Sequence, residues 1–175
     1  MLISLPIEIE HKFLVHKDLL PTTLTRNCVD ISQGYLTEKG NTVRVRISRD
    51  LKSAIRAHLC IKGKSKGLAK PEFEYEIPVH HAEHMLRNMC EDRIVHKNRY
   101  LVTLPNFEDT LMWEVDVFKG HLDGLIVAEV EVPTVDYELA IPPWVRKNVS
   151  KDRQYKNKQL AISQTIPPTY FRKGG

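Results

Sequence analysis

The chain has 175 residues, of which 42% are hydrophobic and 27% are charged, as is typical of one globular domain with a sizeable core. This composition excludes a disordered, fibrous or collagen-like chain, and no apolar run approaches the ~18 residues that a membrane span needs. Cys28, Cys60 and Cys90 form no CxxC pair. Their odd number argues against a disulfide framework or a zinc ribbon, and we expect a reducing cytoplasm.

The net charge of +4 is unevenly distributed along the chain. Residues 1–143 carry 18 Lys and Arg against 21 Asp and Glu, whereas residues 144–175 carry eight Lys and Arg against Asp152 alone. No linker divides the sequence, so residues 1–175 are expected to form a single domain. Residues 144–175 would be its basic C-terminal segment, helical or extended.

Short segments in which polar and apolar residues alternate follow one another along most of the chain, and such alternation predicts half-buried strands. About eight of them are expected, near residues 7–13, 28–37, 43–47, 54–62, 70–77, 97–102, 113–117 and 128–132. A weakly amphipathic helix is predicted at about 80–91, after Pro78, and another at 143–149. Runs of strands with few helices indicate an antiparallel α+β or barrel fold rather than alternating β–α units.

The polar faces of these strands carry charges that are mostly of one sign on each strand. The patterns are E-x-E-x-K, R-x-R, K-x-E-x-E-x-E, K-x-R, E-x-D and E-x-E. Like charges two residues apart on one face repel each other, so folding alone gives no reason to gather them. Ordinary solvated faces are one explanation, because exposed charge is common. The other is a ligand site, in which carboxylates hold divalent cations and basic groups hold phosphates.

Eight segments in order resemble the CYTH proteins, also called triphosphate tunnel metalloenzymes. They are EIEHKFLV, QGYL, RVRI, IKGKSKGLAKPEFEYEIP, KNRYLV, WEVDVFKG, GLIVAEVEVP and PPWVRKNVSKDRQYKNKQLA. Glu8-x-Glu10-x-Lys12 matches the family's ExExK signature, which by itself would be a weak match. The resemblance implies a closed eight-stranded antiparallel barrel, open at its ends. Its interior would be charged, and its apolar faces would point outward against a few helices.

The resemblance also implies the roles of individual residues in binding a triphosphate with Mg²⁺ or Mn²⁺. Two ions are expected, held by carboxylates at Glu8, Glu10, Glu129 and Glu131, with Asp116 and Glu74 as weaker candidates. Glu8, Glu10, Lys12, Glu129 and Glu131 are the candidate catalytic residues. The phosphate oxygens would be bound by Lys12, Arg44, Arg46, Lys62, Lys70, Lys97 and Arg99.

The sequence departs from the family pattern in its C-terminal part. Asn148 stands where bacterial relatives often carry Glu, and Asp-Pro-Arg-Tyr becomes Asp-Arg-Gln-Tyr at residues 152–155. These changes put the contribution of this segment to the tunnel mouth in doubt, but leave the barrel residues as they are.

The preferred interpretation is hydrolysis of inorganic tripolyphosphate to pyrophosphate and phosphate by a metal-dependent enzyme. Two alternatives stay open. One is a nucleotide-directed member of the family, resembling a class IV adenylate cyclase, a thiamine triphosphatase or an NTPase. The other is a non-catalytic module that binds polyphosphate or a nucleotide. The sequence leaves dimerisation undecided.

Two further motifs favour other functions only weakly. Residues 80–84, HHAEH, match the inverted zinc-protease motif H-x-x-E-H, but no downstream acidic ligand is evident and a solvated helix start explains them. The basic tail, with Tyr155, Tyr170 and Phe171, could bind nucleic acid. It contains no nucleic-acid motif, and charge runs usually remain in water, so we do not expect a nucleic-acid partner.

Overall fold

The computed structural model describes residues 7–20, 28–64, 69–104 and 111–171 of the chain. Among these residues the chain forms nine strands and two α-helices. The strands are β1 (Ile7–Val15), β2 (Cys28–Tyr35), β3 (Thr42–Arg49), β4 (Ile55–Lys62), β5 (Ala69–Glu76), β6 (Ile94–Val102), β7 (Trp113–Phe118), β8 (Ile126–Glu131) and β9 (Val145–Asn148).

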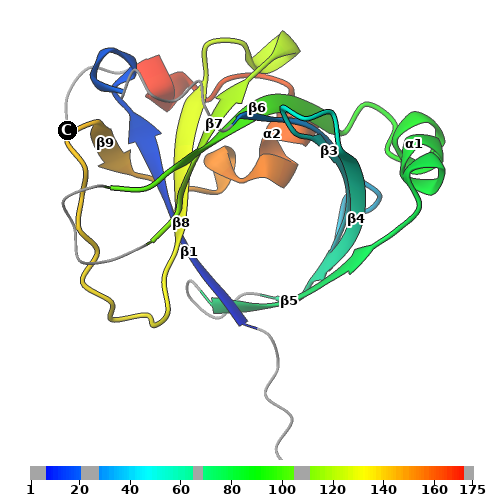
Figure 1. The fold of residues 1–175 in the computed structure, drawn as a ribbon, viewed down its shortest axis with the longest axis horizontal. Coiled ribbons are helices and arrows are strands. Elements are labelled where there is room, and N and C mark those ends of the chain that lie inside the picture. Colours follow the sequence, from blue (N-terminus) through cyan, green and yellow to red (C-terminus); the bar gives the residue numbers. More distant parts are fainter. Residues whose placement is uncertain (1–6, 21–27, 65–68, 105–110, 172–175) are drawn as a thin grey trace, which may run out of the picture.

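Eight of the strands close into an antiparallel barrel (Figure 1). The order is β5-β4-β3-β2-β6-β7-β8-β1, and β1 returns to β5 through the pairs Ile7↔Pro71 to Ile9↔Ala69. Charged residues of neighbouring strands therefore lie side by side in the barrel wall, as at Lys12↔Glu129 and Arg99↔Asp116. The predicted closed eight-stranded barrel is confirmed.

The helix predicted at 143–149 is wrong, because β9 occupies most of this segment. β9 pairs antiparallel with β1 through Phe13↔Asn148, Leu14↔Lys147 and Val15↔Val145. Buried backbone N–H and C=O groups must find partners, and this end of β1 offers them on the side away from β8. Pairing with β1 therefore determines the extended conformation of this segment, against the helix that its local sequence predicts.

Apolar side chains on the outer surface of the barrel form two clusters, one that includes Trp144 and one beneath the helix α1 (Val79–Asn88). Phe13 of β1, Trp113 of β7 and Trp144 form one cluster, with Trp113 and Trp144 rings 5.1 Å apart. The helix α1, which overlaps most of the predicted range, packs on β3 and β4. A Cβ at Gly34 would lie 2.6 Å from the Cys90 sulfur and 2.8 Å from Leu86, so glycine permits this close packing.

The interior of the barrel has a charged part and an apolar part. Leu14, Phe118 and Val127 alternate with outward-facing residues and so point inward, where they pack with Tyr155 and Leu160. Leu160 belongs to α2 (Asn157–Ser163), which contacts β2 and β6. The short 3₁₀ helices are η1 (Lys17–Leu19), η3 (Gly120–Leu122), η4 (Arg153–Tyr155) and η5 (Pro168–Phe171). The C-terminal segment therefore packs into one end of a barrel that was expected to be open at its ends.

None of the described helices is both long and apolar enough to cross a membrane.

Candidate active site

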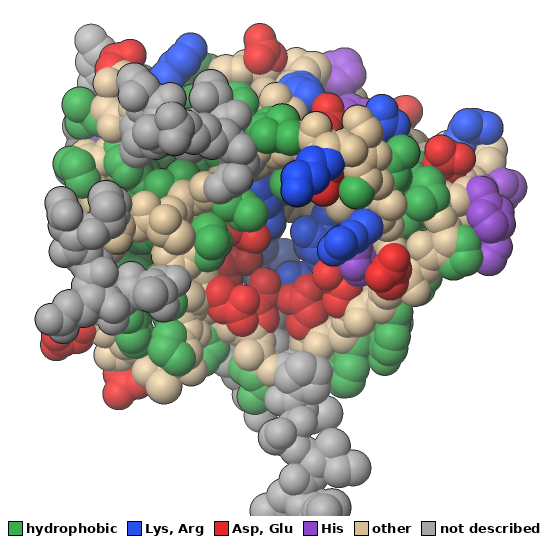
Figure 2. Space-filling model, in the orientation of Figure 1, with side chains coloured by type: hydrophobic (Ala, Val, Ile, Leu, Met, Phe, Trp, Pro, Cys, Tyr) green, Lys and Arg blue, Asp and Glu red, His purple; other side chains and the backbone are tan. Residues whose placement is uncertain are grey.

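The charged part of the barrel interior is a cavity of about 740 Å³. Figure 2 shows the hollow, with acidic side chains along its lower edge and basic side chains inside and above. Most of the site residues expected from the sequence line it, namely Glu8, Glu10, Lys12, Arg44, Arg46, Lys62, Glu74, Arg99, Glu129 and Glu131. Lys97 and Asp116 lie outside the lining. The Lys70 side chain is outside what the structure describes, although its backbone pairs with Glu8.

One wall of the cavity presents two arginines that share a carboxylate. Arg44 and Arg46 alternate along β3, so both point inward, and each places Nη2 2.7 Å from Glu74 Oε2. Burial raises the pKa of Glu74, but the two guanidinium groups outweigh it and the net pKa is lowered. Glu74 is therefore ionised and keeps the two arginines oriented toward the cavity.

Lys62 of β4 lies between carboxylates from two neighbouring strands. Its Nζ is 2.9 Å from Glu8 Oε2 and 2.7 Å from Glu72 Oε2. Because β5 pairs with both β1 and β4, the barrel closure brings these three residues together.

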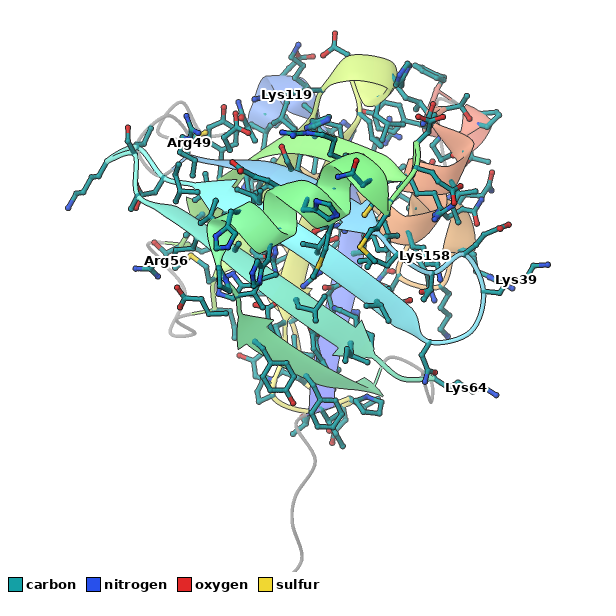
Figure 3. All side chains as sticks on the ribbon, turned by 90° about the vertical axis from the view of Figure 1, so that its right-hand side faces the viewer. Lys39, Arg49, Arg56, Lys64, Lys119 and Lys158 are labelled. Carbon is teal, nitrogen blue, oxygen red and sulfur yellow. The ribbon has the colours of Figure 1, made fainter. Side chains whose placement is uncertain are left out.

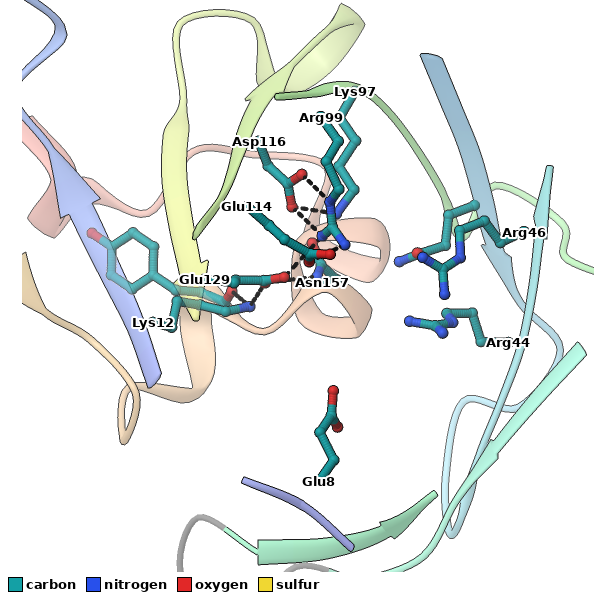
Figure 4. Close-up of polar contacts among 12 residues, drawn as sticks. Glu8, Lys12, Arg44, Arg46, Lys97, Arg99, Glu114, Asp116, Glu129 and Asn157 are labelled. Carbon is teal, nitrogen blue, oxygen red and sulfur yellow. Dashed lines mark hydrogen bonds and ion pairs between the residues drawn. The ribbon is translucent and has the colours of Figure 1, made fainter. Parts of the chain in front are cut away.

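Glu129 is the centre of the opposite wall (Figure 4). It accepts contacts from Lys12 Nζ at 2.5 Å, Arg99 Nη2 at 2.9 Å and Asn157 Nδ2 at 3.2 Å. Burial raises the pKa of Glu129, but Lys12, Lys97 and Arg99 dominate and hold it well below its usual value. In this arrangement the carboxylate is ionised, and both its oxygens are occupied by hydrogen-bond donors.

Arg99 is fixed by a two-point contact with Asp116. Its Nε lies 2.7 Å from Oδ1 and its Nη2 lies 2.8 Å from Oδ2, the paired geometry that a planar guanidinium favours. Glu114 contacts Nη1 of the same guanidinium. Three carboxylates on β7 and β8 thus orient one arginine at the cavity wall.

Lys97 lies behind this wall. Its side chain is 1% exposed, and its Nζ is 2.5 Å from Oδ2 of Asp116, which is itself 0% exposed. Burial and the neighbouring Arg99 lower the pKa of Lys97 to about 8, against the opposing pull of Asp116. The structure therefore places Lys97 and Asp116 where they support Arg99.

Carboxylates on neighbouring strands lie opposite one another along the acidic edge of the cavity. Glu10 lies directly opposite Glu131, and Glu114 opposite Glu129, in the strand register. Burial and the nearby Glu8, Glu72 and Glu114 raise the pKa of Glu131, and burial raises that of Glu114. Carboxylate oxygens are the ligands that Mg²⁺ and Mn²⁺ prefer, and this edge carries several carboxylates.

A second group of possible metal ligands is formed by Cys60, Glu72 and Glu74, whose ligand atoms lie within 4.8 Å of one another. Burial raises the pKa of the Cys60 thiol to about 12, and Arg44, Arg46 and Lys62 already neutralise the two carboxylates. A protonated thiol is a poor ligand for Mg²⁺. Lys62 also contacts Glu8, so basic side chains occupy carboxylates of this group and of the acidic edge alike.

Two buried donors on the basic wall lack partners among the described residues. These are Nε of Arg44 and Nε of Arg46, both on side chains that line the cavity. An unsatisfied buried donor is costly, and a ligand with acceptor oxygens would relieve that cost. Phosphate oxygens supply such acceptors.

Sequence reasoning missed several residues that line the cavity. Glu72 and Glu114 belong to the charged alternating patterns, which could have identified them. Lys156, Asn157 and Lys158 come from the C-terminal segment and carried no such signal. They reach the cavity because η4 and α2 pack at the inner end of the barrel.

The H-x-x-E-H motif has a different position. His80, His81 and His84 are exposed on α1, outside the barrel. Within the described part of the chain, none of them belongs to a group of three metal-ligating side chains. The solvated helix start therefore explains the motif.

Comparison with known proteins finds inorganic triphosphatases that are similar to this chain in sequence and in structure. The chain is 37% identical over 158 residues to an inorganic triphosphatase of Acetivibrio thermocellus, covering 87% of this chain and 92% of that protein. It is also 37% identical to an inorganic triphosphatase of Nitrosomonas europaea, over 89% of this chain and 97% of that protein. A crystal structure of the inorganic triphosphatase NE1496 superposes with a TM-score of 0.62 at 35% identity, covering 91% of this chain and 96% of that one. No family model matches the sequence.

Proposed function

The chain belongs to the family of the inorganic triphosphatases, and we propose that it hydrolyses inorganic tripolyphosphate to pyrophosphate and phosphate inside its barrel. The observation that carries this proposal is the pair of unpartnered Nε donors of Arg44 and Arg46 in a cavity lined by basic side chains from several strands. Tripolyphosphate carries about four negative charges near neutral pH, and its burial needs several cations at once.

Binding would begin at the basic wall. Arg44 and Arg46 now share Glu74, and phosphate oxygens can occupy the guanidinium donors that Glu74 leaves unused. Arg offers two oxygens a planar fork, whereas Lys62 acts as a point charge. These groups stabilise the negative charge that builds up on the leaving pyrophosphate.

On the opposite wall, the basic side chains would be held in fixed positions. Glu129 and Asp116 keep Lys12 and Arg99 oriented before any ligand arrives, so no reorganisation is needed during reaction. In this proposal Lys97 and Asp116 position Arg99 rather than contact phosphate, because neither lines the cavity.

We propose that Glu8, Glu10 and Glu131 hold the divalent cations, Glu8 after exchanging its contact with Lys62 for a cation. Glu129, Asp116 and Glu74 would stay paired mainly with basic side chains. Mg²⁺ or Mn²⁺, as two ions, would supply charge neutralisation on the phosphate oxygens and an acidified water. A carboxylate edge beside a polyanion site supports a metal requirement, since without cations the two would repel each other.

Two coarser proposals concern the protein as a whole. We propose a reducing cytoplasm as its location, supported by three free thiols at Cys28, Cys60 and Cys90. We also propose that residues 1–175 act as one domain, supported by the packing of Leu160 and Tyr155 against the barrel strands.

The test is an assay with tripolyphosphate, ATP and thiamine triphosphate, each with Mg²⁺, with Mn²⁺ and with a chelator. Phosphate, pyrophosphate and cyclic AMP are scored separately. We expect equal amounts of phosphate and pyrophosphate from tripolyphosphate, lost with the chelator. Cyclic AMP from ATP would instead indicate a cyclase, and ligand-induced stabilisation without turnover would indicate a binding module.

A further inference from the structure

Asn157 is a cavity residue for which no role was predicted from the sequence. It is the first residue of α2, it lines the cavity, and its Nδ2 donates to Glu129 Oε1 at 3.2 Å. Figure 4 shows it beside Glu129, with Arg44 and Arg46 pointing toward this cluster from the other wall. Asn157 therefore lies where the two charged walls meet the C-terminal segment.

The orientation of its amide follows from its partner. An ionised carboxylate only accepts hydrogen bonds, so the NH₂ group and not the carbonyl must face Glu129. Glu129 is ionised because Lys12 and Arg99 hold it so. The carbonyl oxygen Oδ1 must then point away from Glu129.

Oδ1 of Asn157 is buried and meets no donor among the described residues. The other unpartnered buried atoms on the cavity lining are the Nε donors of Arg44 and Arg46, which phosphate oxygens can satisfy. An acceptor such as Oδ1 cannot be satisfied by a deprotonated phosphate oxygen, because both groups only accept. Its partner must bring an O–H or N–H group.

Water is the reactant of triphosphate hydrolysis that carries O–H groups. We propose that Asn157 positions the attacking water, one of whose O–H groups donates a hydrogen bond to Oδ1. This inference rests on the proposed function. The water oxygen then bonds to the terminal phosphorus, the bond from that phosphorus to the bridging oxygen breaks, and pyrophosphate leaves with the electron pair. The water's proton passes to solvent.

The Glu129 contact gives Asn157 the rigidity that such a role needs. Its Nδ2 is anchored by a carboxylate that is itself held by two cations, and α2 is fixed by the fully buried Leu160. A water held in one orientation gains reactivity through positioning, and such effects reach about 100-fold in rate.

The experiment compares Asn157→Ala with Gln159→Ala, an exposed position on the same helix. We expect Asn157→Ala to lower kcat for tripolyphosphate about 10- to 100-fold with KM within threefold of the parent, and Gln159→Ala to change neither. Stabilisation by imidotriphosphate, a non-hydrolysable analogue, should be the same in all three proteins. A kcat within threefold of the parent, or an effect on KM alone, would overturn the proposal.

A second variant tests the hydrogen-bonding groups of the Asn157 side chain. In Asn157→Asp the new carboxyl group keeps an acceptor at this position but faces the Glu129 carboxylate. The nearby cations are Lys12 and Arg99, which contact Glu129, and Lys156 and Lys158, which adjoin residue 157 in the chain. When protonated, the new carboxyl group can donate to Glu129 and still accept from water. We expect the ratio of variant to parent kcat to rise as pH falls from 8 to 6, and a constant ratio would contradict the proposal. If the parent releases no phosphate from tripolyphosphate, the proposed function fails instead.

Discussion

At the scale of single residues, the cavity charges are paired before any ligand is present. Lys62 contacts Glu8 and Glu72, Lys12 contacts Glu129, and Arg44 contacts Glu74. On the acidic edge, in addition, Glu131 lies directly opposite Glu10 in the strand pair. Like charges placed opposite each other destabilise a sheet, so this edge lowers stability where a cation would restore it.

Glu131→Gln should therefore separate stability from function. In the presence of a chelator we expect the variant to be more stable than the parent by about 0.5 kcal/mol, because a repelling carboxylate is removed. In the presence of Mg²⁺ its phosphate release should fall. Urea unfolding and the phosphate assay measure the two effects, and Glu138→Gln, at an exposed position away from the cavity, is the matched control. Lower stability together with unchanged turnover would contradict the cation-site assignment.

Lys97 predicts a dependence of stability on pH. Its pKa is lowered to about 8 in the folded state, mainly by burial, from the ordinary value of 10.5. Below pH 8 it is protonated in both states, and its buried charge lowers stability. Between pH 8 and 10.5 the unfolded chain binds more protons than the folded one, so the free energy of unfolding rises with pH. We expect the parent to gain stability relative to Lys97→Met over this range in urea unfolding, whereas a constant difference would contradict the assignment.

At the scale of secondary-structure elements, alternation was a reliable guide for the strands and less so for the C-terminal segment. β1, β3 and β5 turn their charged residues inward, as their patterns implied. β2 differs, since its Asp30 is outside and paired with Lys119, while Ile31, Gln33 and Tyr35 are buried. Polar alternation thus identifies a strand, but the strand pairing decides which face lines the cavity.

The α2 helix provides a stability test of the C-terminal packing. Leu160 is fully buried among inward-facing barrel side chains, whereas Ile162 on the same helix is 37% exposed. We expect Leu160→Ala to lower the free energy of unfolding by about 3 kcal/mol, and Ile162→Ala by less than about 1 kcal/mol. Urea unfolding followed by tryptophan fluorescence measures both. Equal effects of the two substitutions would show that α2 is not packed in this way.

At the scale of the whole molecule, closure of the barrel places basic and acidic residues from distant parts of the chain around one cavity. Basic residues such as Lys39, Lys64 and Lys158 lie at one end of the barrel and Arg49, Arg56 and Lys119 at the other (Figure 3). A bound polyanion with its cations would neutralise both walls together. Ligand binding and folding should therefore be strongly linked.

Tripolyphosphate with Mg²⁺ should raise the melting temperature. At a ligand concentration of a hundred times Kd, the expected stabilisation is about 2.7 kcal/mol, or about 5–10 °C for a chain of this size. Arg46→Met should reduce the shift, because one of the unpartnered donors is lost, whereas Lys119→Met, on an exposed side chain outside the cavity lining, should not. A thermal scan that shows no shift for the parent would contradict a triphosphate site.

The sequence by itself determined the strands, the closed barrel and most of the charged residues that line the cavity. Alternation of like charges marks a strand face, and eight ordered segments matched a known family. Only the tertiary structure showed that residues 145–148 are a strand and that Asn157, with its neighbouring lysines, reaches the cavity. It also placed Lys97 and Asp116 behind the wall. These features depend on contacts between residues far apart in the chain, and no local pattern encodes such contacts.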